Sequence, residues 1–225
     1  SFDVTLAGIA TVYNATGIVS ATKFCGDGSC LTGLAGFSAD SQENLYAGAC
    51  AGNASDSDTC FNVVLGYLAG CNLNSGDNIV FIGCCAGRCA YSSSNNIYIG
   101  SLAGLSGNSG EHNIAFGRNA GYQVSGNYNF LAVYDAGATQ SSAGCNIKIG
   151  YRAGRNGTSN DNVVIGSLAN ACGSSNSCSI IIGRDSAKCL GSGTDNIVIG
   201  RKALFGSSTL SSNTGSDNIA IGCVA

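Results

Sequence analysis

The sequence predicts an all-β fold, a parallel β-solenoid or β-roll of about eleven rungs with a period near 17 residues. The first observation is a residue step, usually Ile-Gly, that recurs at intervals of 16 to 18 residues and once at 22. Self-similarity at a fixed period of this length indicates a repeat architecture. The anchor positions that end each step are Gly48, Gly66, Gly83, Gly100, Gly117, Val133, Gly150, Gly166, Gly183, Gly200 and Gly222.

The second observation is the apolar pattern before each anchor. The stretch Asn96–Gly104 is a representative unit. The residues three and one before the anchor are apolar in nearly every unit, as at Ile97 and Ile99. This period of two in mostly β-branched residues predicts one short strand per unit, with these side chains on one face. The anchor glycine then ends the strand at a tight corner that requires a positive φ or close backbone approach.

The third observation is what surrounds the strand. A small residue three after the anchor, such as Ala103, fits an inward position in a thin corner, and a Ser/Asn/Gly/Asp loop closes the unit. The asparagine before the strand, such as Asn96, is expected to form a ladder of amides along the stack. One strand and one loop cannot bury a core alone, so each rung must cover its neighbour about 4.8 Å away.

Composition excludes several classes of function. The 225 residues include 34 glycines and no proline, methionine or tryptophan, which is typical of a regular, turn-rich chain. The formal net charge of -3 gives no sign of a basic stripe, so we expect no nucleic-acid partner. No apolar run reaches the roughly 18 residues of a membrane helix, so we expect no membrane insertion.

Residues 1–42 differ from the repeat domain, residues 43–225. Phe2, Val4 and Leu6 alternate with polar residues, and two turns follow. We interpret the segment as a β lead-in that caps the first rung or docks on another chain, because an open edge recruits a partner. Gly26–Ser29 is interpreted as a turn, since one acidic residue supplies too few oxygens for calcium.

Both the lead-in and the repeat units resemble segments of known fibre proteins. Thr16–Phe24, Gly26–Ser29 and Leu31–Leu34 resemble a segment of phage and viral tail-fibre proteins. Units such as Asn196–Leu204 and Asn218–Gly222 resemble the Asn-x-x-Ile-Gly repeats of trimeric autotransporter adhesin heads and of fibres matured by an endosialidase-type chaperone. The resemblance implies a parallel β-roll in an extended surface fibre, often trimeric, that is used for attachment.

The 13 cysteines suggest disulfides and an oxidising compartment. Equivalent positions on adjacent rungs lie within disulfide reach, which predicts bridges between Cys172 and Cys189 and between Cys71 and Cys89; Cys25 and Cys30 are a plausible local pair. A zinc site at Cys84, Cys85 and Cys89 competes, but no second cysteine pair or histidine stands at ligand spacing. The odd count leaves at least one thiol free, buried or bonded between chains. Acceptor sequons at Asn14, Asn53 and Asn156 are compatible with glycosylation.

The middle residue of each strand is expected to face outward and form an oligomer interface. Only one member of this column is charged, and a continuous apolar stripe normally marks an interface. The predicted interface residues are Tyr46, Val64, Phe81, Tyr98, Leu131, Val164, Ile181 and Val198. The unit that holds Ala225 is also expected to leave a rung edge open for β-augmentation by a second subunit.

Catalysis has little support. His112 lies in an ordinary repeat turn rather than beside a nucleophile and an acid. Loop carboxylates are interpreted as turn caps rather than a glycan-cleaving pair; they are Asp56, Asp58, Asp77, Asp161, Asp195 and Asp217. Sugar binding by the exposed tyrosines 67, 122, 128 and 151 is open. We therefore expect no enzyme, cofactor or metal site.

The expected protein is a structural fibre of a virion or cell surface, a stiff oligomeric shaft for attachment. The alternative is the subunit of an extracellular filament that polymerises head to tail through its first strands and its open last rung. Expected partners are the chain itself, as a trimer or helical filament, and surface glycans.

Overall fold

The computed structural model describes residues 39–173, 175–205 and 215–225, all within a unit that spans residues 35–225. The predicted lead-in therefore lies almost wholly outside the described residues. So do the predicted turn at Gly26–Ser29, the pair Cys25 and Cys30, and the sequon at Asn14.

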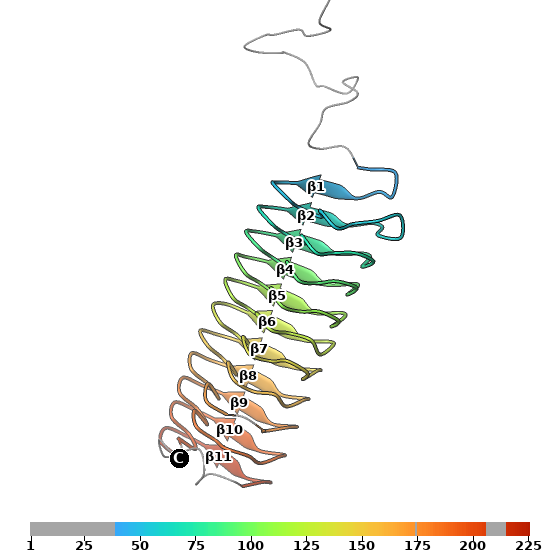
Figure 1. Ribbon diagram of the computed structural model, residues 1–225. Coiled ribbons are helices and arrows are strands. Elements are labelled where there is room, and N and C mark those ends of the chain that lie inside the picture. Colours follow the sequence, from blue (N-terminus) through green and yellow to red (C-terminus); the bar gives the residue numbers. More distant parts are fainter. Residues whose placement is uncertain (1–38, 174, 206–214) are drawn as a thin grey trace, which may run out of the picture. The chain divides into compact units, whose positions relative to one another are not determined.

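Eleven parallel strands of three residues each form one sheet, in which every strand pairs with the next along the chain. The register is that of the repeat, so that Ile97 of one rung pairs with Ile114 of the next. Figure 1 shows the strands stacked over one another, with a loop closing each rung, and the described residues contain no helix. The β-solenoid with a period near 17 is confirmed. The strands are β1 (Leu45–Ala47), β2 (Val63–Leu65), β3 (Val80–Ile82), β4 (Ile97–Ile99), β5 (Ile114–Phe116), β6 (Phe130–Ala132), β7 (Ile147–Ile149), β8 (Val163–Ile165), β9 (Ile180–Ile182), β10 (Ile197–Ile199) and β11 (Ile219–Ile221).

The middle residue of each strand points into the solenoid, and the two residues beside it point out. From β2 to β10 every middle residue is buried, whereas its neighbours are half-buried or exposed. The prediction that the middle column faces outward was wrong. Both faces of these strands are apolar, so the alternation located the strands but did not say which face was inside.

The corners need the residues that the repeat supplies. Gly100 has φ +134°, and a Cβ there would lie 2.7 Å from the carbonyl carbon and oxygen of Gly117 on the next rung. Val133, the one anchor without glycine, has φ 84°. The small residues three after the anchor are confirmed as inward and fully buried on nine rungs: Ala69, Ala86, Ala103, Ala120, Ala136, Ala153, Ala169, Ser186 and Ala203.

On some rungs the thin core is filled by a pair of residues whose sizes compensate. On the rung of β4, Tyr98 enters the core and Gly107 stands across from it, where an added Cβ would lie 3.3 Å from the tyrosine oxygen. On the rung of β5 the order is reversed, because Ala115 is small and Val124 is buried in the same core cluster. The compensation is not general, because both members are large and buried on three other rungs: Val64 with Leu73, Leu131 with Gln140, and Ile181 with Leu190.

The asparagine ladder is also confirmed. The backbone N–H of Asn113 donates to Asn96 Oδ1 at 2.8 Å, and that of Asn129 donates to Asn113 Oδ1 at 3.0 Å. Asn129 Nδ2 donates to Asn113 Oδ1 at 2.9 Å, which is a direct amide-to-amide contact. Because buried polar groups must be hydrogen-bonded, each rung satisfies its neighbour. The column contains Ile79 and Ser179 in place of asparagine.

Candidate functional site

The predicted oligomer interface is not on the surface. Seven of its eight residues are fully buried in the core, and Tyr46 is half-buried; the seven are Val64, Phe81, Tyr98, Leu131, Val164, Ile181 and Val198. A side chain enclosed by its own chain cannot contact a second subunit, so these residues are corrected to core residues.

The surface that takes their place is the outer face of the sheet, formed by the first and third residue of every strand. It is composed of isoleucine, valine, leucine, phenylalanine and alanine alone. Ile147 and Ile180 are each 41% exposed, and Ile219 is 72% exposed. With eleven strands about 4.8 Å apart and two columns of side chains, the face covers roughly 500 Å². That lies at the upper end of the largest apolar patch on a typical monomer.

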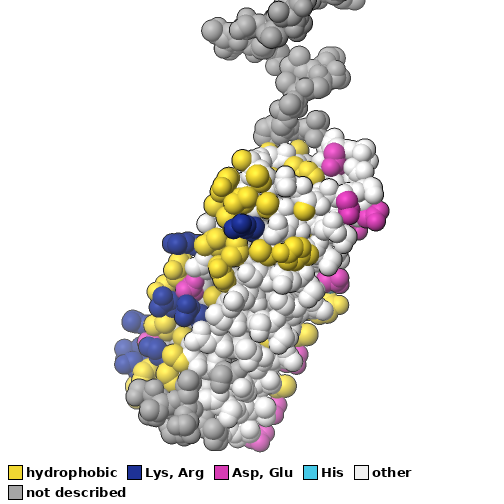
Figure 2. All heavy atoms as spheres, in the orientation of Figure 1, with side chains coloured by type: hydrophobic (Ala, Val, Ile, Leu, Met, Phe, Trp, Pro, Cys, Tyr) yellow, Lys and Arg dark blue, Asp and Glu magenta, His cyan; other side chains and the backbone are white. Residues whose placement is uncertain are grey.

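The two flanks of the sheet carry opposite charge. Among the described residues, every exposed lysine and arginine lies within five residues after an anchor, on a flank that we call the basic edge. Figure 2 shows most of the blue side chains along one border of the solenoid and most of the magenta ones along the other. The basic edge comprises Arg88, Arg118, Arg152, Arg155, Arg184, Lys188, Arg201 and Lys202.

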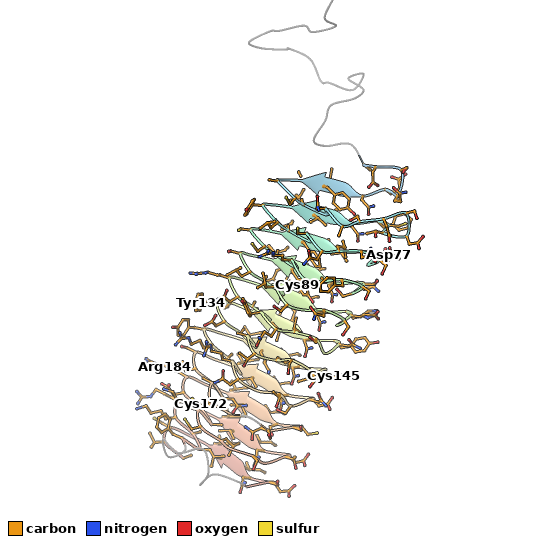
Figure 3. All side chains as sticks on the ribbon, viewed as in Figure 1. Asp77, Cys89, Tyr134, Cys145, Cys172 and Arg184 are labelled. Atoms are coloured by element: carbon orange, nitrogen blue, oxygen red, sulfur yellow. The ribbon has the colours of Figure 1, made fainter. Side chains whose placement is uncertain are left out.

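Acidic residues occupy the loops that lead into the strands, which lie on the opposite flank. In Figure 3, Asp77 lies on that flank, together with Cys145, whereas Tyr134 and Arg184 lie on the basic edge. Asp135 and Asp185 are the exceptions, since both are buried on the basic edge. The acidic flank holds Asp40, Glu43, Asp56, Asp58, Asp77, Glu111, Asp161, Asp195 and Asp217.

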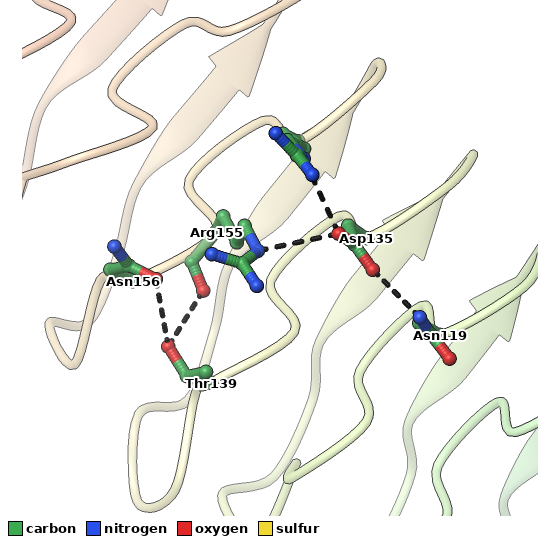
Figure 4. A network of polar contacts seen from close by, with 6 residues as sticks. Asn119, Asp135, Thr139, Arg155 and Asn156 are labelled. Carbon is green, nitrogen blue, oxygen red and sulfur yellow. Dashed lines mark hydrogen bonds and ion pairs between the residues drawn. The ribbon is translucent and has the colours of Figure 1, made fainter.

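Each of the two buried aspartates is held between two cations. Asp135 Oδ2 lies 3.4 Å from Arg152 Nε and 3.3 Å from Arg155 Nε, and its Oδ1 accepts a hydrogen bond from Asn119 Nδ2 at 2.9 Å (Figure 4). Both arginine side chains remain about 40% exposed. Arg152 Nε donates a hydrogen bond to this carboxylate, whereas Arg155 Nε contacts it as an ion pair only. One carboxylate thus faces two guanidinium groups without neutralising both.

Tyrosines extend this cluster along the edge. Tyr134 and Tyr151, on adjacent rungs, stack with ring centroids 5.6 Å apart and planes 15° apart. Arg118 lies over the ring of Tyr134 at 5.8 Å, and Arg152 lies over that of Tyr151 at 5.1 Å. We refer to Arg118, Tyr134, Asp135, Tyr151, Arg152 and Arg155 as the Asp135 cluster.

A polar cleft of about 250 Å³ opens beside the cluster. Its walls carry amide, hydroxyl, carboxylate and guanidinium groups, and Asn119 Oδ1 is buried there with no hydrogen-bond partner. An unsatisfied buried acceptor of this kind lowers stability. The lining residues are Asn119, Tyr122, Gln123, Asp135, Ala138, Thr139 and Arg155.

The cysteines of the described residues are all present as thiols. Cys172 and Cys189 occupy equivalent positions on adjacent rungs, and the pKa of the Cys189 thiol is raised by burial and by the hydrogen bond with Cys172. Their bridge stays a prediction, with the geometry in its favour. Cys71 and Cys89 are one position out of register. Cys89 faces Asn72 instead, and Asn72 Nδ2 lies 3.8 Å from Cys89 Sγ. A bridge from Cys71 to Cys89 would therefore require a shift of the backbone.

The remaining candidates stay separate. His112 stacks on Tyr128 with centroids 5.0 Å apart. Asp56 accepts bonds from its own loop, as a turn cap does. Asp77 instead accepts one from the Cys60 N–H of the preceding rung, which is a contact between rungs. The sequons at Asn53 and Asn156 are exposed, and their glycosylation stays a prediction. Within the described ranges, no three histidine, cysteine or acidic side chains gather as a metal site would require.

Sequence reasoning missed the basic edge because it counted charge over the whole chain. Opposite charges nearly cancel in the net value of -3, although they occupy different positions of the repeat. The signal was available: sorting the charged residues by their distance from the anchor separates the two flanks. The expectation that no basic stripe exists is corrected.

No protein-family model, no curated protein and no solved structure matches this chain. Among the residues that the structure describes, no helix is long and apolar enough to cross a membrane.

Proposed function

We propose that this protein is a structural fibre component of a virion or cell surface, in which copies associate through the outer face into a stiff shaft used for attachment. The observation that carries the proposal is the outer face itself, two unbroken columns of apolar side chains along the whole sheet. A soluble sheet with one buried face normally presents polar residues on the other.

The size of the face supports association of several copies. Roughly 500 Å² on the strands is less than the roughly 800 Å² per partner of a standard interface. Loop residues beside the strands would supply the difference, and two or more outer faces packed around one axis would cover every column. We therefore favour a closed oligomer, with a trimer as the first case to examine.

A head-to-tail filament is the second candidate. A sheet of parallel strands stacked rung over rung is an arrangement that strands of a second copy could extend.

Light scattering and electron microscopy across a hundredfold range of protein concentration separate the candidates. A closed shaft gives one mass and one particle length at every concentration above its dissociation constant. A filament grows longer with concentration, and a monomer at every concentration would refute both.

A further inference from the structure

We propose that the Asp135 cluster and its cleft form a binding site for an acidic polysaccharide, a chain of sugars that carries carboxylate or sulfate groups. The inference rests on the proposed attachment role and gives it a ligand class. It follows from three features that occur together at one stretch of the basic edge: oriented cations, exposed aromatic rings and a polar cleft.

The cations are available to an anion. Asp135 takes one Nε contact from each of Arg152 and Arg155, which leaves their terminal amino groups for a ligand. Arg118 has no ion pair among the described residues and lies over Tyr134. Guanidinium groups held in place by a buried carboxylate are suited to bidentate recognition of carboxylate or sulfate oxygens.

The cleft matches the other parts of a sugar. Its amides, at Asn119 and Gln123, and the hydroxyl of Thr139 can donate to and accept from sugar hydroxyls. Tyr122 in the wall, and Tyr151 in contact with Arg152 of the cluster, supply flat apolar surfaces with a polar end, which suit the mixed character of a sugar ring.

A nucleic acid fits less well. Nucleic-acid binding commonly uses six to ten phosphate contacts, and DNA carries a charge about every 1.7 Å. Here Arg88, Arg118, Arg201 and Lys202 are the edge cations without an ion pair in the described residues, and the opposite flank is acidic. Tyr134 and Tyr151 also stack on each other, so no base can enter between them. A polymer with sparser charge and many hydroxyls is the better match.

Binding to defined probes tests the proposal. Polygalacturonate supplies carboxylates, dextran sulfate supplies sulfates, dextran is the neutral control, and a single-stranded oligonucleotide represents nucleic acid. Calorimetry at about 50 and 150 mM salt should detect one or both acidic polysaccharides, with weaker affinity at the higher salt. Dextran should not bind detectably up to about 1 mM sugar units.

Three variants locate the site. Arg155→Gln and Tyr151→Ala should each weaken binding about tenfold. Arg88→Gln, a cation of the same edge outside the cluster, should change it less than about twofold. Tyr151→Ala leaves the contacts of Asp135 intact, so it remains informative if Arg155→Gln is unstable.

The proposal is overturned if neither acidic polysaccharide binds, if all three variants bind equally, or if the oligonucleotide binds more tightly than both polysaccharides. The oligomer mass measured on the same samples keeps the two proposals apart. If the wild-type protein forms an oligomer but binds neither acidic polysaccharide, the binding site alone is rejected. If the wild-type protein is a monomer that binds an acidic polysaccharide, the shaft alone is rejected.

Discussion

The apolar core of the solenoid consists of two blocks, and a lysine lies between them. The first block runs from Val64 to Leu131 and contains the largest buried side chains, with Phe81 and Tyr98 stacked at 4.9 Å and 2°. The second block runs from Ala153 to Ala203 and contains no aromatic ring. Between them, in the middle of β7, Lys148 occupies the core position and is 2% exposed.

Lys148 is tolerated because its ammonium group reaches backbone acceptors. Its Nζ donates to the carbonyl oxygens of Gly154 and Gly157 at 3.3 Å each, and the absence of a side chain at Gly157 leaves room for the Nζ. Burial lowers the pKa of Lys148 to about 7. The same position thus holds an apolar residue in one rung and a titratable one in another. The position in the repeat determines whether a side chain points into the core. The residue type at that position determines how much the buried side chain stabilises the fold.

The largest expected effect is the loss of the aromatic pair in the first block. Tyr98→Ala should lower the free energy of unfolding by about 3–5 kcal/mol, because it opens a cavity opposite Gly107. Ile181→Ala in the second block should lower it by about 2–4 kcal/mol. Urea unfolding measures both, with Tyr67→Ala, at a side chain that is 57% exposed, as a control within about 0.5 kcal/mol. Equal losses for Tyr98→Ala and Tyr67→Ala would contradict the direction assigned to the strand residues.

The second effect is the pH dependence of stability that Lys148, between the two blocks, should cause. The folded pKa of Lys148 is about 7 and the ordinary value is 10.5, so between these pH values the unfolded state binds more protons. The free energy of unfolding should therefore rise by up to about 1.4 kcal/mol per pH unit from pH 7 to 10. Below pH 7 Lys148 should contribute no further pH dependence, because both states are protonated. At pH 7 the variant Lys148→Met should be more stable than the wild type.

The difference between the wild type and Lys148→Met isolates this effect, because cysteines and tyrosines titrate in both proteins. Their unfolding free energies should converge as the pH rises towards 10. A constant difference across the range would show that Lys148 is not buried as an amine.

The third and smallest effect concerns the anchors. Val133→Gly should raise the free energy of unfolding by about 1 kcal/mol, because a β-branched residue is strained at φ 84° and its side chain is 48% exposed. Gly100→Ala should lower it by at least about 1–3 kcal/mol, since its Cβ would overlap the next rung. Thermal unfolding of both variants tests the pair, and a stabilised Gly100→Ala would argue against the corner geometry.

Much of the fold could be predicted from the sequence because each rung repeats the same local conditions. The strands, the anchor glycines, the inward alanines such as Ala103 and the asparagine ladder all follow from columns of one residue type. Which face of each strand lies inside could not be predicted from hydrophobicity, because Ile97, Tyr98 and Ile99 are all compatible with a core. The burial of the middle residues decides the direction. The compensation in size between Tyr98 and Gly107 and between Ala115 and Val124 was a partial signal that sequence reasoning did not use.

The candidate site was harder to predict, because the residue type changes from rung to rung within its columns. Asn119, Asp135 and Arg152 all stand two residues after an anchor, yet each is a different residue, and Arg155 comes from another column. The tyrosines at 122 and 151 were noted as candidate sugar contacts, but nothing in the repeat pattern joined them to a buried aspartate. Only the stacking register brings these side chains together.

The most direct test of the account is the mass of the particle when the outer face is made charged. Ile147→Glu combined with Ile180→Glu changes two half-exposed positions, and Ser92→Glu combined with Ser141→Glu adds the same charge at exposed loop positions. Light scattering should show the isoleucine variant as a folded monomer, with an unchanged circular dichroism spectrum, and the serine variant at the mass of the wild type. An isoleucine variant that keeps the wild-type oligomer mass would contradict the claim that copies associate through this face.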